Sequence, residues 1–123
     1  MGSVKQFQVT FDCAEPERVA RFWCEVLGYV YVEGQNSCVD PTGVGPRLYF
    51  QRVPESKVVK NRVHLCVRVG TGMVGDERLA ALEAECTRLV PLGAVRQRLL
   101  RADGVNESCI VMQDIEGNEF CID

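Results

Sequence analysis

The single histidine of this 123-residue chain, His64, is the side chain best suited to acid–base or metal chemistry at neutral pH. Its imidazole is a good ligand for zinc, nickel, iron or manganese. Because the chain has one histidine, it cannot by itself supply a catalytic or metal site that needs several histidines. The alternative is that His64 is a polar group facing a wet cavity.

Seven cysteines are spread along the chain, an odd number, and no two are spaced as Cys-x-x-Cys. This pattern predicts neither a disulfide framework nor a zinc ribbon. We therefore expect most of them to be small buried apolar side chains. Cys24 and Cys86 lie in helical patterns, and Cys13 follows the first predicted strand.

The basic cluster of the sequence consists of Arg96, Arg98 and Arg101. Their spacing, close to every second residue, is typical of the outer face of a strand, and we favour that interpretation over a phosphate-binding role. The net charge is −3, with acidic and basic residues interspersed. This argues against a nucleic-acid or anionic-membrane partner, which would need clustered Lys and Arg.

Several signatures of other protein classes are missing from the sequence. Gly43-x-Gly45 lacks the Lys and the following helix of a nucleotide-binding loop, and there is no Gly-x-Ser-x-Gly elbow. No apolar run approaches the roughly 20 residues of a membrane span. The first residues do not resemble a signal peptide. We expect one cytoplasmic domain with a small-molecule ligand.

The first half of the chain has the pattern of a strand, a helix and three further strands. Gln6–Asp12 alternates polar and apolar residues, which predicts a half-buried strand. Pro16 stands in the first turn of an amphipathic helix that stops at Gly28. Three strands are predicted at residues 29–32, 37–39 and 47–53.

The second half repeats this pattern. A strand at 63–69 and a glycine-rich stretch precede a helix with Asp76 as its predicted N-cap and an apolar stripe from Leu79 to Leu89. Strands are predicted at residues 94–100, 108–113 and 119–122. Residues also repeat: Glu17-Arg18-Val19-Ala20 corresponds to Glu77-Arg78-Leu79-Ala80, and Asp40-x-x-Gly43 to Asp114-x-x-Gly117. The sequence predicts a single α+β domain of two βαβββ modules, at about 4–53 and 62–123.

The internal repeat predicts which four residues lie on the sheet faces that the helices do not cover. If the apolar residues of each first strand pack on its helix, Gln8 and His64 occupy matching positions on the opposite face. Aligning the last strands of the modules matches Tyr49 with Cys121. We expect these residues to line one small-molecule pocket.

Three more side chains are candidates for contact with a ligand. Gln51 lies two residues beyond Tyr49, on the same face, and could donate a hydrogen bond. Arg68 could pair with an anionic ligand. Trp23 is either part of the core or a wall of the pocket.

Four segments resemble the vicinal oxygen chelate superfamily, the glyoxalase, bleomycin-resistance and dioxygenase group, and in particular its glyoxalase-like domains. They are QVTFDCAEPERVARFWCEVLGY, VDPTGVGPRLYFQRVP, NRVHLCVRV and DIEGNEFCID. The resemblance implies two βαβββ modules that form a curved mixed sheet around a cavity, commonly in a homodimer. In metal-using members a divalent cation binds two adjacent substrate oxygens.

The resemblance places the metal ligands at Gln8, His64 and Cys121, with Tyr49 at the fourth position. Cys121 stands where the family usually has glutamate. A thiolate suits zinc or copper, but it removes the hard oxygen that manganese prefers and a carboxylate that could act as a general base. Glu119 lies on the same side of the strand but closer to the turn, and we do not expect it to reach the site.

Two functions remain open at this point. The first is a metal-dependent lyase, isomerase or dioxygenase that acts on a vicinal-oxygen substrate, with zinc, nickel, iron or manganese on His64, Gln8 and Cys121. The second is a metal-free, drug-sequestering protein of the bleomycin-resistance type. A regulatory or scaffold domain without a working pocket is a third. The missing glutamate and the single histidine count against the classical glyoxalase reaction.

Overall fold

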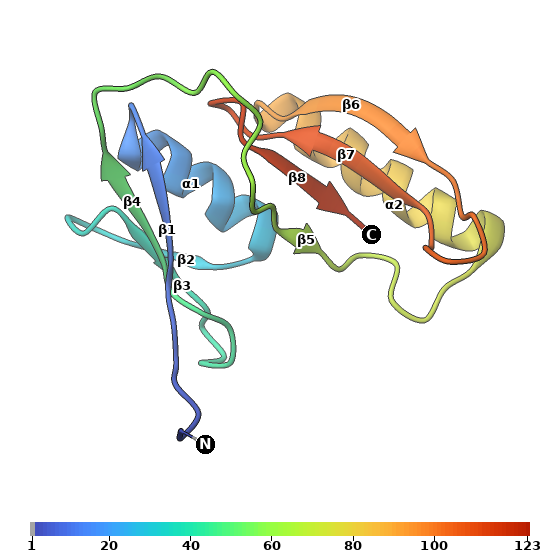
Figure 1. Ribbon diagram of the computed structural model, residues 1–123, viewed down its shortest axis with the longest axis horizontal. Coiled ribbons are helices and arrows are strands. Elements are labelled where there is room, and N and C mark those ends of the chain that lie inside the picture. Colours follow the sequence, from blue (N-terminus) through green and yellow to red (C-terminus); the bar gives the residue numbers. More distant parts are fainter. Residues whose placement is uncertain (1) are drawn as a thin grey trace. The chain divides into compact units, whose positions relative to one another are not determined.

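The computed structural model describes residues 2–123, which form two compact units whose boundary lies between Ser56 and Lys57 (Figure 1). Each unit contains one α-helix and its own four-stranded mixed sheet. The two sheets have the same topology, with strand orders β1-β4-β3-β2 and β5-β8-β7-β6. The predicted α+β fold of two βαβββ modules is confirmed.

The first unit is built on one helix and four strands. The first and last strands of this unit pair in parallel, and the two remaining pairs of neighbouring strands are antiparallel. The elements are β1 (Val9–Cys13), α1 (Pro16–Leu27), β2 (Val30–Val32), β3 (Ser37–Val39) and β4 (Leu48–Arg52). Helix α1 ends where Gly28 adopts the left-handed conformation, at a φ of 70°.

The aromatic core of the first unit shows which face of its sheet is covered. The Phe11 ring of β1 lies 5.1 Å from the Trp23 ring of α1 and 5.1 Å from the Phe50 ring of β4, measured between centroids. Trp23 and Phe50 are both buried. Because successive strand residues point to opposite faces, Gln8 and Tyr49 lie on the open face.

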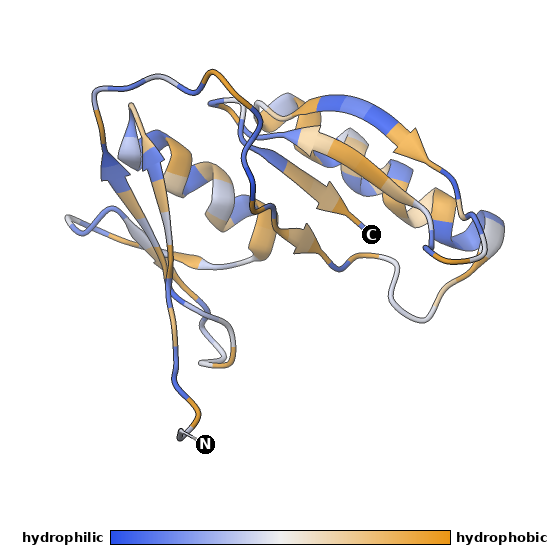
Figure 2. Ribbon diagram, in the orientation of Figure 1, coloured by the Kyte–Doolittle hydropathy of each residue, from blue (hydrophilic) through white to orange (hydrophobic). Residues whose placement is uncertain are grey.

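The second unit repeats the order with a longer helix. Its elements are β5 (Cys66–Val67), α2 (Gly75–Leu89), the short 3₁₀ helix η1 (Val90–Leu92), β6 (Val95–Leu100), β7 (Cys109–Gln113) and β8 (Glu119–Ile122). Most of β7 and β8 is hydrophobic, whereas the middle of β6 is hydrophilic (Figure 2). Ile110, Met112, Phe120 and Ile122 are fully buried with Leu82 of α2. The alternating residues of these strands face away from the helix.

Two predicted boundaries in the second unit are wrong. The first strand is much shorter than 63–69, because as an edge strand it meets only β8, and Val63 is exposed. Backbone bonds from Cys121 N to Leu65 O and from Asp123 N to Val67 O continue the pairing around it. The N-cap of α2 is Val74, so Asp76 lies in the first turn of the helix.

The prediction that Cys24 is a simple packing residue is also wrong. Cys24 of α1 and Cys38 of β3 form a disulfide, with their Cα atoms 6.0 Å apart. The sequence gives no sign of it, because the pair has no motif spacing. It depends on the packing of α1 against β3.

Candidate functional site

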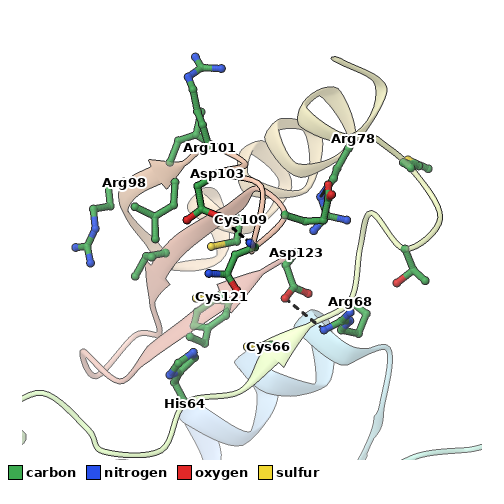
Figure 3. Close-up of a pocket in the computed structure, with 18 of the residues that line it drawn as sticks. His64, Cys66, Arg68, Arg78, Arg98, Arg101, Asp103, Cys109, Cys121 and Asp123 are labelled. Carbon is green, nitrogen blue, oxygen red and sulfur yellow. Dashed lines mark hydrogen bonds and ion pairs between the residues drawn. The ribbon is translucent and has the colours of Figure 1, made fainter. Parts of the chain in front are cut away.

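A cavity of about 1000 Å³ lies against the open face of the second sheet. Its lining includes His64 and Cys66 from the segment at β5, Cys121 from β8 and Cys109 from β7. All of them belong to the second unit. Figure 3 shows these side chains, with His64 beside Cys66 and Cys121.

Strand geometry brings three possible metal ligands together in this cavity. His64 and Cys66 are two residues apart and therefore share a face. Cys66 lies directly opposite Cys121 in the parallel β5–β8 pair. The ligand atoms of His64, Cys66 and Cys121 all lie within 4.8 Å of one another.

The thiols of this cluster are protonated at neutral pH. Burial, followed by the neighbouring thiols of Cys109 and Cys66, raises the pKa of the Cys121 thiol to about 12. Burial, followed by the Asp123 carboxylate, also raises the pKa of Cys66. A metal cation bound beside the two thiols would lower the pKa of both, because its positive charge stabilises the negatively charged thiolates.

The donor set fits a soft or borderline divalent ion. One imidazole and two sulfurs are typical zinc ligands, and three protein ligands leave a position for a substrate. Oδ1 of Asp123, two residues beyond Cys121 in the chain, is buried without a hydrogen-bond partner, but it is not among the clustered ligand atoms. Buried carboxylate oxygens normally have such a partner.

Glu119 lines the same cavity but is engaged elsewhere. Its Oε2 lies 3.1 Å from the Lys57 ammonium and accepts a bond from the Asn61 amide at 3.2 Å. Burial acts to raise the pKa of this carboxyl, but the bonds from Asn61 and Lys57 outweigh it, and the pKa is lowered. Glu119 is thus an ionised group with partners of its own and does not replace the missing family glutamate.

A buried arginine closes the other end of the cavity. Arg78 of α2 is 6% exposed, and its guanidinium donates to the carbonyl oxygens of Gly70 at 2.9 Å and Ser108 at 2.8 Å. These hydrogen bonds connect the start of α2 to the loop before it and to the residue before β7. Arg78 was not singled out from the sequence as a functional or core residue.

The structure places four of the other predicted site residues in the first unit: Gln8, Trp23, Tyr49 and Gln51. Gln8 is exposed, and its Oε1 accepts a hydrogen bond from Arg47 Nη1 at 2.9 Å. The same Arg47 guanidinium lies 5.5 Å from the centre of the Tyr49 ring. A guanidinium on the amide oxygen competes with a cation there, so Gln8 would have to leave Arg47 to bind a metal.

Two predicted ligand contacts have different surroundings. Gln51 is exposed on the same face as Tyr49. Trp23 is 1% exposed, between Phe11 and Phe22. In this structure Trp23 is a core residue and offers almost no surface to a ligand.

Arg96 and Arg98 of β6, and Arg101 directly after it, do not share one outer face, which corrects the sequence interpretation. Arg96 points to the helix side, where its Nη1 lies 2.7 Å from Oε2 of Glu83 in α2. Arg98 and Arg101 line the cavity instead. Arg68, the predicted anion partner, also lines it and lies 3.4 Å from Asp123 Oδ2.

Three residues of the site were missed as candidates: Cys66, Cys109 and Asp123. Simple alternation from His64 indicates Cys66, and alternation from Cys121 indicates Asp123. Cys109 has no such local signal, since its position beside Cys121 depends on the antiparallel register of β7 and β8.

None of the helices formed by residues 2–123 has the length and apolar character needed to span a bilayer.

Comparison with known proteins places the chain among glyoxalase-like structures. Residues 8–122 match the family model of the glyoxalase-like domain. A glyoxalase/bleomycin resistance protein/dioxygenase family enzyme from Burkholderia phytofirmans PsJN aligns at a TM-score of 0.70 and 16% identity, covering 94% of each chain. The fosfomycin resistance protein FosX from Mesorhizobium loti aligns at 0.65 and 15%, covering 96% of this chain and 89% of that chain.

A third solved structure contains a metal and a ligand. It is a mutant of FosX from Listeria monocytogenes, complexed with Mn(II) and 1S,2S-dihydroxypropylphosphonic acid, with a TM-score of 0.68 and 13% identity. The alignment covers 99% of this chain and 90% of that chain. At such identities these structures establish a shared fold. No curated protein matches the chain.

Proposed function

Since the chain belongs to the glyoxalase-like domain family, we propose that it is a metal-dependent enzyme that acts on a small molecule with two adjacent oxygens. The family has the fold of the glyoxalase/bleomycin resistance/dioxygenase superfamily, in which FosX has been solved with Mn(II). The observation that carries the proposal is the cluster of His64, Cys66 and Cys121, whose ligand atoms lie within 4.8 Å in an open cavity.

The proposed metal is zinc rather than the manganese of that FosX structure. Manganese prefers oxygen ligands, whereas zinc accepts imidazole and thiolate. When bound, zinc would supply Lewis acidity to a carbonyl or enolate oxygen of the substrate. His64 and the two cysteines would hold the ion and keep a coordination position open.

The remaining proposed roles concern binding and orientation. Arg68 is attached to Asp123 by one long contact of 3.4 Å and is largely exposed, so it can turn towards an anionic substrate group. Tyr49 and Gln51, on the open face of the first sheet, are proposed to contact substrate. Gln8 is proposed as a further metal ligand. A homodimer is proposed from the resemblance to the superfamily.

A cytoplasmic location, predicted from the sequence, is part of the proposal. The disulfide between Cys24 and Cys38 offers a test of it, because disulfides persist mainly in oxidising compartments. The redox state of this pair in protein taken from cells under thiol-blocking conditions tests the prediction.

Metal content tests the proposed function. We expect close to one equivalent of zinc per chain in untagged protein after exposure to zinc, measured by elemental mass spectrometry. His64→Ala and Cys121→Ser should lose it, because each removes a ligand. The matched control Cys13→Ser, which changes a buried cysteine of the first unit that is not in the disulfide, should retain it.

The opposite result has a definite meaning. Protein that binds neither zinc nor nickel, manganese or iron(II) would contradict the enzyme proposal. Tight ligand binding without turnover would then support the metal-free, drug-sequestering function.

A further inference from the structure

Three cysteines lie side by side across the second sheet. Cys66, Cys121 and Cys109 come from β5, β8 and β7, which are neighbours in that order. All three line the cavity, and Figure 3 shows Cys121 between the other two. The Cys121 thiol forms hydrogen bonds with the thiols of both Cys66 and Cys109. Cys121 therefore has two candidate partners for a disulfide bond.

The strand register favours Cys66 over Cys109 as that partner. Cys66 lies directly opposite Cys121, and neighbouring strands are about 4.8 Å apart, within the roughly 4.4–6.8 Å between Cα atoms that a disulfide spans. Cys109 is two residues from Val111, which is the residue opposite Cys121 in β7. Such diagonal neighbours have Cα atoms about 7–8 Å apart, too far for a bridge without movement of the backbone.

The thiols of Cys66 and Cys121 differ in their access to solvent. Cys66 is exposed, whereas Cys121 is buried. A small oxidant can therefore reach the Cys66 sulfur first. The Cys121 sulfur lies within 4.8 Å of it and is held there by the sheet. An accessible thiol with a second thiol beside it is typical of cysteines that respond to oxidation.

We propose that Cys66 and Cys121 are a redox modification site, which forms a reversible disulfide on reaction with a hydroperoxide such as hydrogen peroxide. The peroxide transfers one oxygen atom to the Cys66 thiol, which becomes a sulfenic acid, and the remainder leaves as water. The Cys121 sulfur then attacks the Cys66 sulfur. The S–O bond breaks, the S–S bond forms, and the hydroxyl group leaves with the Cys121 proton as a second water. A dithiol restores both thiols by exchange.

The disulfide would prevent metal binding at the cluster. A cysteine binds a metal as the thiolate, so oxidation removes two of the three clustered ligands and leaves His64 alone. Bound zinc should in turn protect both sulfurs from the peroxide. This effect on the metal rests on the proposed function, whereas formation of the disulfide does not.

Peptide mapping of metal-free protein tests the inference. The protein is treated with hydrogen peroxide, its remaining thiols are blocked, and it is digested without reductant by trypsin and then by a protease that cleaves after acidic residues. The second protease is needed because only cleavage at Asp114, Glu116 or Glu119 separates Cys109 from Cys121. We expect a peptide containing Cys66 to be linked to one containing Cys121, and dithiothreitol to release them.

Two variants make the test specific. Cys121→Ser should lose the linked peptides, and its Cys66 should accumulate as a sulfenic acid that dimedone traps. Cys109→Ser is the matched control, because it changes the other thiol beside Cys121 in the same sheet and should retain the link. Thermal unfolding of both variants checks that the fold is retained.

The outcomes separate this inference from the proposed function. A link between Cys66 and Cys121 in protein that never binds zinc supports the inference, and only the enzyme proposal then fails. Where zinc does bind, the peroxide should displace it, and zinc that stays on the linked protein would contradict the effect on the metal. A link from Cys121 to Cys109 instead, or no link to Cys121 at all, overturns the inference, whatever the metal content.

Discussion

At the scale of single residues, the protonation of two thiols controls the chemistry of the cavity. The pKa of the Cys121 thiol is raised to about 12 by burial and by the neighbouring thiols, and burial also raises that of Cys66. A metal ion needs the thiolate form, so its binding must release protons. Its apparent affinity is therefore expected to increase with pH.

Alkylation rates should reveal these raised pKa values. In metal-free protein we expect Cys121 to react slowly at pH 7, since the thiolate is the reacting form and a raised pKa lowers its fraction. The rate should rise about tenfold per pH unit and continue to rise above pH 9, whereas an ordinary thiol of pKa ~8.5 levels off there. Peptide mass spectrometry of timed reactions measures both. The unfolded chain is the control, and a Cys121 rate that levels off near pH 9 contradicts the prediction.

Arg78 makes a second prediction at this scale. Arg78→Met should lower the free energy of unfolding by about 3 kcal/mol, because the buried carbonyl oxygens of Gly70 and Ser108 lose their donors. Arg88→Met is the matched control, because Arg88 is exposed and pairs with Glu85 within the same helix. Urea unfolding compares the two. Equal effects would show that the buried contacts of Arg78 add little.

At the scale of elements, the disulfide joins α1 to β3 inside the first unit. Cys24 and Cys38 are 14 residues apart. Closing a loop of this length restricts the unfolded chain, which stabilises the folded one by about 3 kcal/mol in the chain-entropy model.

A reductant should therefore lower the midpoint of thermal unfolding. The effect should be absent in Cys24→Ser, which cannot form the bond and so controls for other actions of the reductant. Differential scanning calorimetry with and without reductant measures it. The same midpoint in wild-type protein under both conditions would mean that the disulfide adds no stability.

At the scale of the whole molecule, zinc is expected to stabilise the second unit. The three clustered ligands, His64, Cys66 and Cys121, all come from residues 57–123. A ligand at one hundred times its Kd adds about 2.7 kcal/mol to the stability of the state that binds it. Hydrogen exchange should then show new protection in β5, β7 and β8.

The same exchange experiment separates two versions of the site. Protection confined to the second unit would show that these three residues suffice. Protection that extends to β1 would support Gln8 as a further ligand. Zinc that leaves exchange unchanged throughout the chain would contradict a metal centre at these residues, and Cys121→Ser provides the control without a site.

The sequence by itself determined the repeat, the order of the elements and the open faces. Period-two alternation assigned Gln8 and Tyr49 to one face and His64 and Cys121 to another, because the apolar residues between them have to meet a helix. These are local or repeated features, and burial of one face enforces them. The resemblance to glyoxalase-like domains could be read from the same segments.

Only the tertiary structure decided which residues from distant parts of the chain lie side by side. Cys66 meets Cys121 only through the β5–β8 register, and Arg98 lines the cavity only because β6 has a bulge at Gln97. The Cys24–Cys38 disulfide and the buried Arg78 depend likewise on helix packing. Such contacts join residues far apart in the chain, and the hydrogen bonds and packing that select them leave no periodic pattern in the sequence.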